Sequence, residues 1–191
     1  MHQSIKNGVM IIFLATVFSS CNQGESLQSY YVNNQETPNF ISVDIPTSFV
    51  KIDETELTEE QLEAYHSIDK LNMLGYSISE DEEEYKTELA KVQTILNNEK
   101  YEDLMRGGNS KDGKIIVKMI PGANDTIDEL IVFGSASNRG FAIVRVLGDK
   151  MDPSKIMKLG NVLSKVTTEE NDVSGFMDFF KMDSIEIPAI E

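Results

Sequence analysis

Three strand-like runs that follow one another at short intervals constrain the fold of this chain more than any other feature. The runs cover residues 114–120, 127–134 and 140–147, and the segments between them are rich in Gly, Pro, Asn, Asp and Ser. Such segments form tight turns, whereas a crossover between two parallel strands needs a dozen residues or more. The three runs therefore predict an antiparallel meander.

Two earlier segments extend the predicted sheet. Apolar residues alternate with polar ones over 39–46, which predicts a strand. From 69 to 78 the alternation runs through two sets, the first ending at Met73 and the second beginning at Leu74. Because the two sets are out of step by one residue, this segment predicts a strand with a β-bulge.

Helical spacing of apolar residues indicates two main helices. Apolar side chains recur every three or four positions from Tyr85 to Leu96, behind a capping box at 79–82. A second such face follows the Asp-Pro pair at 152–153, which is an N-cap with Pro at the first helical position. Shorter helical segments are expected behind the capping box at 58–61 and over 101–105, the latter ended by Gly107 and Gly108.

These elements predict an α+β fold. We expect a mostly antiparallel sheet of four to five strands, with the two amphipathic helices packed on one face. One domain is expected, because 191 residues are too few for two of ordinary size.

The N-terminus has the pattern of an export signal. Lys6 precedes an apolar run from Val9 to Phe18, and two serines then lead to Cys21. A helix of ten residues spans about 15 Å, half of a bilayer core, so the run predicts a cleaved signal rather than a membrane span.

The position of Cys21, the single Cys of the chain, resembles the lipobox of bacterial lipoproteins, although Phe18 stands where Leu is usual. The resemblance implies cleavage before Cys21 and attachment of lipid to its thiol and to the new amino terminus. The alternative is an ordinary signal peptide with an incidental Cys, or an uncleaved anchor. We therefore divide the chain into a lipoprotein signal peptide (1–20), a polar tether (21–37), a single α+β domain (38–166) and an acidic C-terminal tail (167–191).

The acidic tail also contains an apolar patch. Its members are Phe176, Met177, Phe179, Phe180 and Met182. One interpretation is that these residues cover part of the core or add an edge strand. The other is that they engage a partner, because exposed apolar patches commonly mark interaction sites.

Composition excludes nucleic acid as a partner. The chain has 32 acidic and 17 basic residues and a formal net charge of −15, whereas binding to phosphate backbones depends on Lys and Arg. Lipid on Cys21 would anchor the protein without a basic patch. Asn22 lacks the negative charge that marks inner-membrane retention in some bacteria, which favours the outer membrane and leaves the membrane face open.

No motif specifies a catalytic, cofactor-binding or metal-binding site. The GxxxxGK pattern at 108–114 is that of a phosphate loop, but Ile115 stands where Ser or Thr would hold magnesium, and a strand follows instead of a helix. His66 is the only His outside the signal, which excludes a site with two His ligands. The acids at 80–84 lack the spacing of a calcium loop and suit a helix N-terminus.

Five segments form a recognisable combination. They are 39–43 (NFISV), 91–96 (KVQTIL), 101–106 (YEDLMR), 127–132 (IDELIV) and 144–148 (VRVLG). This combination resembles the DUF4252 family of exported, often lipidated proteins of the Bacteroidetes, which have no assigned function. The resemblance covers about 38–164 and rests on packing positions, so it implies fold and location and supplies no catalytic residues.

Exported Bacteroidetes proteins are often O-glycosylated at Asp, then Ser or Thr, then a residue with a methyl-bearing side chain. The chain has this pattern at 125–127 and 183–185, which makes Thr126 and Ser184 candidate sites. Thr126 follows a predicted turn and Ser184 lies in the tail, so both hydroxyls are expected to be reachable. Three-residue patterns also occur by chance, and Thr126 can simply begin a strand.

The leading hypothesis is a non-enzymatic cell-envelope lipoprotein. Lipid on Cys21 would hold it in the membrane, and its domain would present a binding surface to a protein, peptide or glycan, without a cofactor. One alternative is a small carboxylate-based hydrolase, which requires a deep pocket with two facing carboxylates. The other is a structural subunit of an envelope assembly that self-associates through a sheet edge.

Overall fold

The computed structural model describes residues 24–49, 52–78, 82–109, 113–137 and 139–163. Several predicted features lie outside these residues. They are the signal peptide, Cys21, most of the capping box at 79–82, the C-terminal apolar patch and Ser184.

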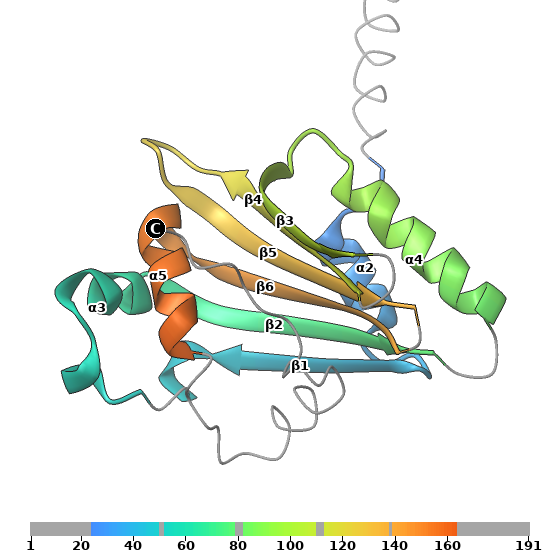
Figure 1. Cartoon of the computed structure of the whole chain (residues 1–191), viewed down its shortest axis with the longest axis horizontal. Coiled ribbons are helices and arrows are strands. Elements are labelled where there is room, and N and C mark those ends of the chain that lie inside the picture. The colour runs from blue at the N-terminus through green and yellow to red at the C-terminus, as the bar shows by residue number, and fades with distance from the viewer. Residues whose placement is uncertain (1–23, 50–51, 79–81, 110–112, 138, 164–191) are drawn as a thin grey trace, which may run out of the picture.

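In the described part of the chain, one open sheet of six strands forms the centre of the molecule (Figure 1). The strands are β1 (Phe40–Pro46), β2 (Ile68–Ser77), β3 (Glu102–Asn109), β4 (Gly113–Pro121), β5 (Ile127–Ala136) and β6 (Gly140–Met151). Their order is β1-β2-β6-β5-β4-β3, and every neighbouring pair is antiparallel. The antiparallel α+β fold and the β4–β5–β6 meander are confirmed, but the sheet has six strands rather than four or five.

The additional strand is β3, where a helical turn over 101–105 was expected. The register of β3 against β4 shifts between Asp103 and Met105, so Leu104 occupies a bulge and is 37% exposed. The bulge places two apolar residues next to each other in the sequence, which hides the alternation typical of a strand. The helical prediction was therefore wrong, because pairing with β4 outweighs the local pattern.

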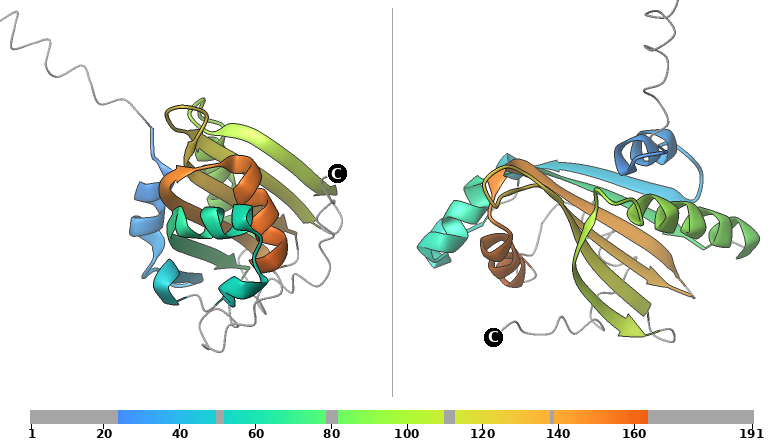
Figure 2. Two further views of the ribbon diagram at one scale, coloured as in Figure 1. Left: turned by 90° about the vertical axis from the view of Figure 1, so that its left-hand side faces the viewer. Right: turned by 90° about the horizontal axis from the view of Figure 1, so that it is seen from above.

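The described residues contain four α-helices, which lie on both faces of the sheet (Figure 2). They are α2 (Leu27–Asn34), α3 (Glu59–His66), α4 (Glu82–Leu96) and α5 (Pro153–Leu163), and the short 3-10 helices η2 (Thr47–Phe49) and η3 (Glu54–Glu56) precede α3. The first face carries α2 and α4, and the second face carries α3 and α5. The prediction of two helices on one face is wrong.

Both faces carry helices because the central strands are apolar on both sides. In β2, Leu74 belongs to the cluster under α2 and α4, and Met73 belongs to a cluster on the second face. The two out-of-step apolar sets of 69–78 are thus the two sides of one regular strand. The register shift of β2 lies earlier, between Ile68 and Lys70.

Two helix starts follow the sequence prediction. The Gln61 backbone N–H donates to Thr58 Oγ1 at 3.3 Å, and the Thr58 N–H donates to Gln61 Oε1 at 2.9 Å, which completes a capping box at α3. At α5, the backbone N–H of Ser154 donates to Asp152 Oδ1 at 2.9 Å, and Pro153 is the first helical residue.

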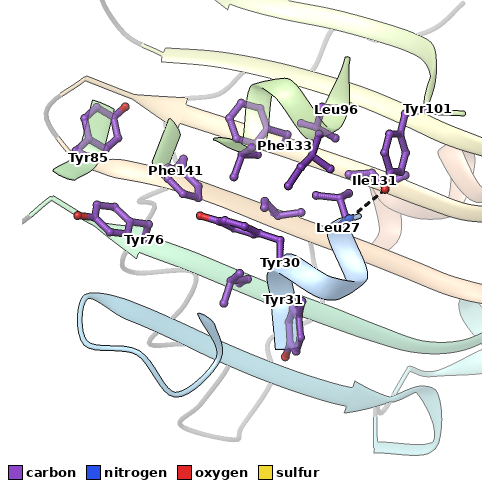
Figure 3. Packing of buried hydrophobic residues seen from close by; sticks show 14 residues of the cluster. Leu27, Tyr30, Tyr31, Tyr76, Tyr85, Leu96, Tyr101, Ile131, Phe133 and Phe141 are labelled. Atoms are coloured by element: carbon purple, nitrogen blue, oxygen red, sulfur yellow. Dashed lines mark hydrogen bonds between the residues drawn. The ribbon is translucent and has the colours of Figure 1, made fainter. Parts of the chain in front are cut away.

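The segment expected to be a tether contains α2, a helix that belongs to the core. Leu27, Tyr30 and Tyr31 are buried in it, and Leu27 and Tyr30 are each only 1% exposed. Figure 3 shows Leu27 and Tyr30 near Leu96, Phe133 and Phe141, with Tyr31 further off, toward β1. The folded unit therefore begins before Pro38, and the tether prediction is wrong for residues 27–34.

Candidate binding groove

A groove of about 730 Å³ runs along the outer side of α4, beside the residues that lead into α2. It is open to solvent along its length. Its lining residues are Gly24, Glu25, Lys86, Thr87, Ala90, Lys91, Thr94, Ile95, Asn97 and Asn98. Segments far apart in the sequence thus form the two walls of one groove.

Small side chains on α4 create the hollow. Thr87, Ala90 and Thr94 recur at a helical spacing of three and four, so they lie on one side of the helix. The Thr87 hydroxyl donates to the Glu83 carbonyl at 2.8 Å, and the Thr94 hydroxyl donates to the Ala90 carbonyl at 2.8 Å. Because the two hydroxyls bond to the helix backbone and Ala90 is small, the three side chains project little from α4. They form the floor of the groove.

Lysines flank this floor. Lys86 Nζ lies 2.7 Å from Glu83 Oε1, and Lys91 Nζ lies 2.6 Å from Glu88 Oε1. An ammonium group has three donors, so each lysine retains hydrogen-bonding capacity beyond its ion pair. The groove therefore suits a ligand that is rich in hydrogen-bond acceptors.

Hydrogen bonds hold α2 against α4 and so fix the position of the second wall. The Leu27 backbone N–H donates to Tyr101 Oη at 3.1 Å (Figure 3). The Tyr30 hydroxyl donates to Glu88 Oε2 at 2.8 Å, on the carboxylate that also pairs with Lys91. Burial raises the pKa of the Tyr30 phenol, and the hydrogen bond to Glu88 and the charge of Glu88 raise it further. Tyr30 therefore remains a neutral donor at physiological pH.

A second set of contacts joins α2 to the sheet through a buried ion pair. Arg145 Nε and Nη2 donate to the two carboxylate oxygens of Glu129 at 2.6 and 2.9 Å. Its Nη1 donates to Gln28 Oε1 at 2.6 Å. Arg145 is 4% exposed and Glu129 is 6% exposed, so α2 closes over a charge pair that water hardly reaches.

Tyr31 makes a second connection between α2 and the sheet. Its hydroxyl donates to Asp44 Oδ1 at 2.8 Å, and the Asn72 side-chain amide donates to the same oxygen. Burial, followed by the hydrogen bond to Asp44, raises the pKa of Tyr31. Three side chains of α2 thus bond to three different strands or helices, which makes the wall of the groove a preformed feature.

The groove offers binding groups rather than paired catalytic groups. Glu25 supplies the one carboxylate among its lining residues, so the described lining has no second acid to face it. Among the residues that the structure describes, no group of three or more His, Cys, Asp or Glu side chains is placed to hold a metal ion. None of the helices described here is long and apolar enough to cross a membrane.

The residues that the sequence analysis considered as catalytic, metal-binding or phosphate-binding groups lie on different elements of the structure. His66 is the last residue of α3, where it is exposed and lies 3.6 Å from Glu54, as expected for a surface His. The GxxxxGK segment begins on β3 and ends on β4 at Lys114, so the strand predicted after it is confirmed, whereas a strand stands where a helix was expected before it. Glu82, Glu83 and Glu84 occupy the exposed first turn of α4, as predicted for a helix N-terminus.

Thr126 lies at the β4–β5 connection and is half-buried. Its hydroxyl donates to the Ala123 carbonyl at 2.6 Å. O-glycosylation of Thr126 stays a prediction, as it does for Ser184.

Comparison with known proteins identifies the family. The model of the family described as "Domain of unknown function (DUF4252)" matches residues 30–159, which is more than half of the chain. The chain belongs to the DUF4252 family. The match begins at Tyr30, within α2, so the DUF4252 domain includes part of the helix that was expected to be a tether. No curated protein and no solved structure matches the chain.

Sequence reasoning did not find the groove, because Lys, Thr and Ala on the outer side of a helix are also typical of an ordinary solvated face. One feature of the sequence could have indicated the groove. The outer side of α4 carries small residues at 87, 90 and 94, where long charged residues are common. The second wall of the groove could not be predicted, because its position depends on the packing of α2, which was expected to be part of a tether.

Proposed function

We propose that this DUF4252 protein is an exported, non-enzymatic cell-envelope lipoprotein, anchored by lipid on Cys21, that binds an extended peptide segment of another envelope protein. The observation that carries this proposal is the α4 groove, in which two lysines and two asparagines flank a floor of small side chains. A preformed hollow with a few polar groups is the usual form of a ligand site.

The dimensions and composition of the groove favour a peptide over a glycan. From Lys86 to the end of α4 the helix rises about 15 Å, which matches about four or five residues of an extended peptide. Peptide carbonyls are acceptors for Lys and Asn donors. No aromatic ring belongs to the described lining, whereas flat ring faces are the natural platform for a sugar.

The position of the groove relative to Cys21 supports a partner at the membrane surface. Gly24 lines the groove and follows Cys21 by three residues, which span at most about 10 Å. Lipid on Cys21 would therefore keep the groove close to the bilayer. A partner would meet it there, and not at the end of a long tether.

Site-directed photocrosslinking in intact cells tests the groove. With a photoreactive amino acid at Thr94, we expect one recurrent adduct with a single envelope protein. Ala90→Arg should abolish this adduct, because a long charged side chain would fill the floor of the groove. Gln93→Arg is the matched control: Gln93 is exposed on α4 but lies outside the groove. Adducts that persist in Ala90→Arg, or that arise equally from position 93, would refute the groove as the binding site.

Replacement of the single Cys tests the anchor separately. Cys21→Ser should lose all incorporated radiolabelled fatty acid and move from the membrane fraction to the soluble fraction, because no other thiol can accept the lipid. Ala90→Arg should stay in the membrane fraction. Retention of label by Cys21→Ser would contradict the anchor and leave the groove experiment unaffected.

A further inference from the structure

The second face of the sheet carries an apolar surface that crosses all six strands. One row of directly paired residues consists of Val43, Met73, Val144, Val132, Val117 and Met105. The next row consists of Ile41, Gly75, Ala142, Gly134, Ile115 and Gly107. We call these two rows the apolar face.

Small residues make the centre of the apolar face low. Gly75, Ala142 and Gly134 are adjacent in the second row, between the larger Ile41 and Ile115. A Cβ atom added to Gly134 would have no neighbouring atom within 4 Å. The face therefore has room for large side chains of whatever segment lies over it.

The described helices leave much of this face without a cover. Ile156 and Leu159 of α5 share a cluster with Val117, Leu130 and Val146, and Met105 and Val132 of the first row also pack against this cluster. The members of the first row that lie outside it are those on β1 and β2 and their neighbour on β6. Figure 1 shows α5 in front of the left-hand part of the sheet. The cluster of Met73 and Ala142 contains only residues of the sheet itself, with no contribution from a described helix.

Nevertheless, Met73 is only 8% exposed and Ala142 is only 7% exposed, whereas Ile41 on the edge strand β1 is 42% exposed. Side chains on a bare sheet face keep their outer side in contact with water, so such low exposure requires a cover. A contiguous apolar surface on a sheet commonly marks an interaction site.

We propose that the C-terminal segment of this same chain, residues 164–191, docks on the apolar face through Phe176, Met177, Phe179, Phe180 and Met182. The chain leaves α5 at Leu163 on this side of the sheet, and 28 residues follow it (191 − 163). The residues between Leu163 and Phe176 can span about 40 Å, whereas six strands are only about 24 Å wide. The apolar patch can therefore reach any part of the face.

Thiol labelling tests this docking. In a chain that begins at Asn22, Ala142→Cys introduces the only Cys, close in size to the native residue. We expect its reaction with a maleimide to be at least about tenfold slower in the chain that ends at Glu191 than in one that ends at Leu163. A full-length Phe179→Ser/Phe180→Ser variant should also react quickly. Addition of a synthetic 164–191 peptide to the shorter chain should restore the slow rate.

A control and two contrary outcomes make the test decisive. Lys114→Cys, exposed on the first face, should react at the same rate in all forms. Equal rates for Ala142→Cys in the long and short chains at micromolar concentration would overturn the proposal. Slow labelling of both chains together with a dimer in light scattering would also overturn it, because a second copy would then be the cover.

Discussion

A chain that begins at Pro38 is expected to be less stable toward unfolding than one that begins at Asn22, by about 5 kcal/mol or more. The shorter chain loses α2, and with it three buried side chains of the core, Leu27, Tyr30 and Tyr31. Truncation of one buried Leu typically costs about 2–5 kcal/mol, and truncation of a large aromatic costs about 3–5 kcal/mol. Urea unfolding followed by circular dichroism measures the difference.

Loss of α2 also removes hydrogen-bond partners from the groups that remain. Glu88 would lose the Tyr30 hydroxyl, Arg145 would lose Gln28, and Asp44 would lose the Tyr31 hydroxyl. Glu88 and Arg145 are buried and keep their ion-pair partners, so each loses one hydrogen bond, which is destabilising by about 1 kcal/mol. The groove would lose one wall at the same time.

Two controls distinguish loss of the helix from loss of length. A chain that begins at Gly24 retains α2 and should unfold at the same urea concentration as the chain that begins at Asn22. Val32→Ala changes an exposed position of α2 and should shift the free energy of unfolding by no more than about 0.5 kcal/mol. Equal midpoints for the chains that begin at Asn22 and at Pro38 would mean that α2 contributes nothing to the core.

The sequence predicts elements whose stability is local. The capping boxes and the Asp-Pro pair are complete within a few residues, and the short turns between β4, β5 and β6 limit the strands to antiparallel pairing. By contrast, α2 has eight residues and a polar sequence, and helices this short depend on tertiary packing. Its side chains depend on partners 13 to 117 positions further along the chain, such as Asp44 for Tyr31 and Arg145 for Gln28.

The covering of the second face was missed for a different reason. Near-continuous apolar runs such as 127–134 and 140–147 are typical of strands buried on both sides. Glu129 and Arg145 interrupt these runs with charges. In the structure they neutralise each other in the interior, and a sequence does not show which charges will be paired.

The second large effect is expected from the Glu129–Arg145 pair. Glu129→Leu should destabilise the fold by about 3–5 kcal/mol, because it leaves the guanidinium of Arg145 buried without a counter-charge. If the unpaired charge causes the loss, a second substitution that removes this charge should restore stability. Glu129→Leu/Arg145→Met removes both charges and should recover most of the lost stability, since replacing a whole buried pair with apolar residues is often neutral or favourable.

Thermal and urea unfolding of the two single variants and the double variant measure the coupling between Glu129 and Arg145. Glu60 provides the surface comparison, because it pairs with Lys158 at 2.8 Å with both side chains more than half exposed. Glu60→Gln should leave the unfolding midpoint nearly unchanged. If the double variant were no more stable than Glu129→Leu, the loss would come from packing around position 129 and not from an unpaired charge. If the double variant recovers its stability, the ion pair adds little net stability of its own. The effect of the ion pair on α2 then lies in the orientation of Arg145 toward Gln28.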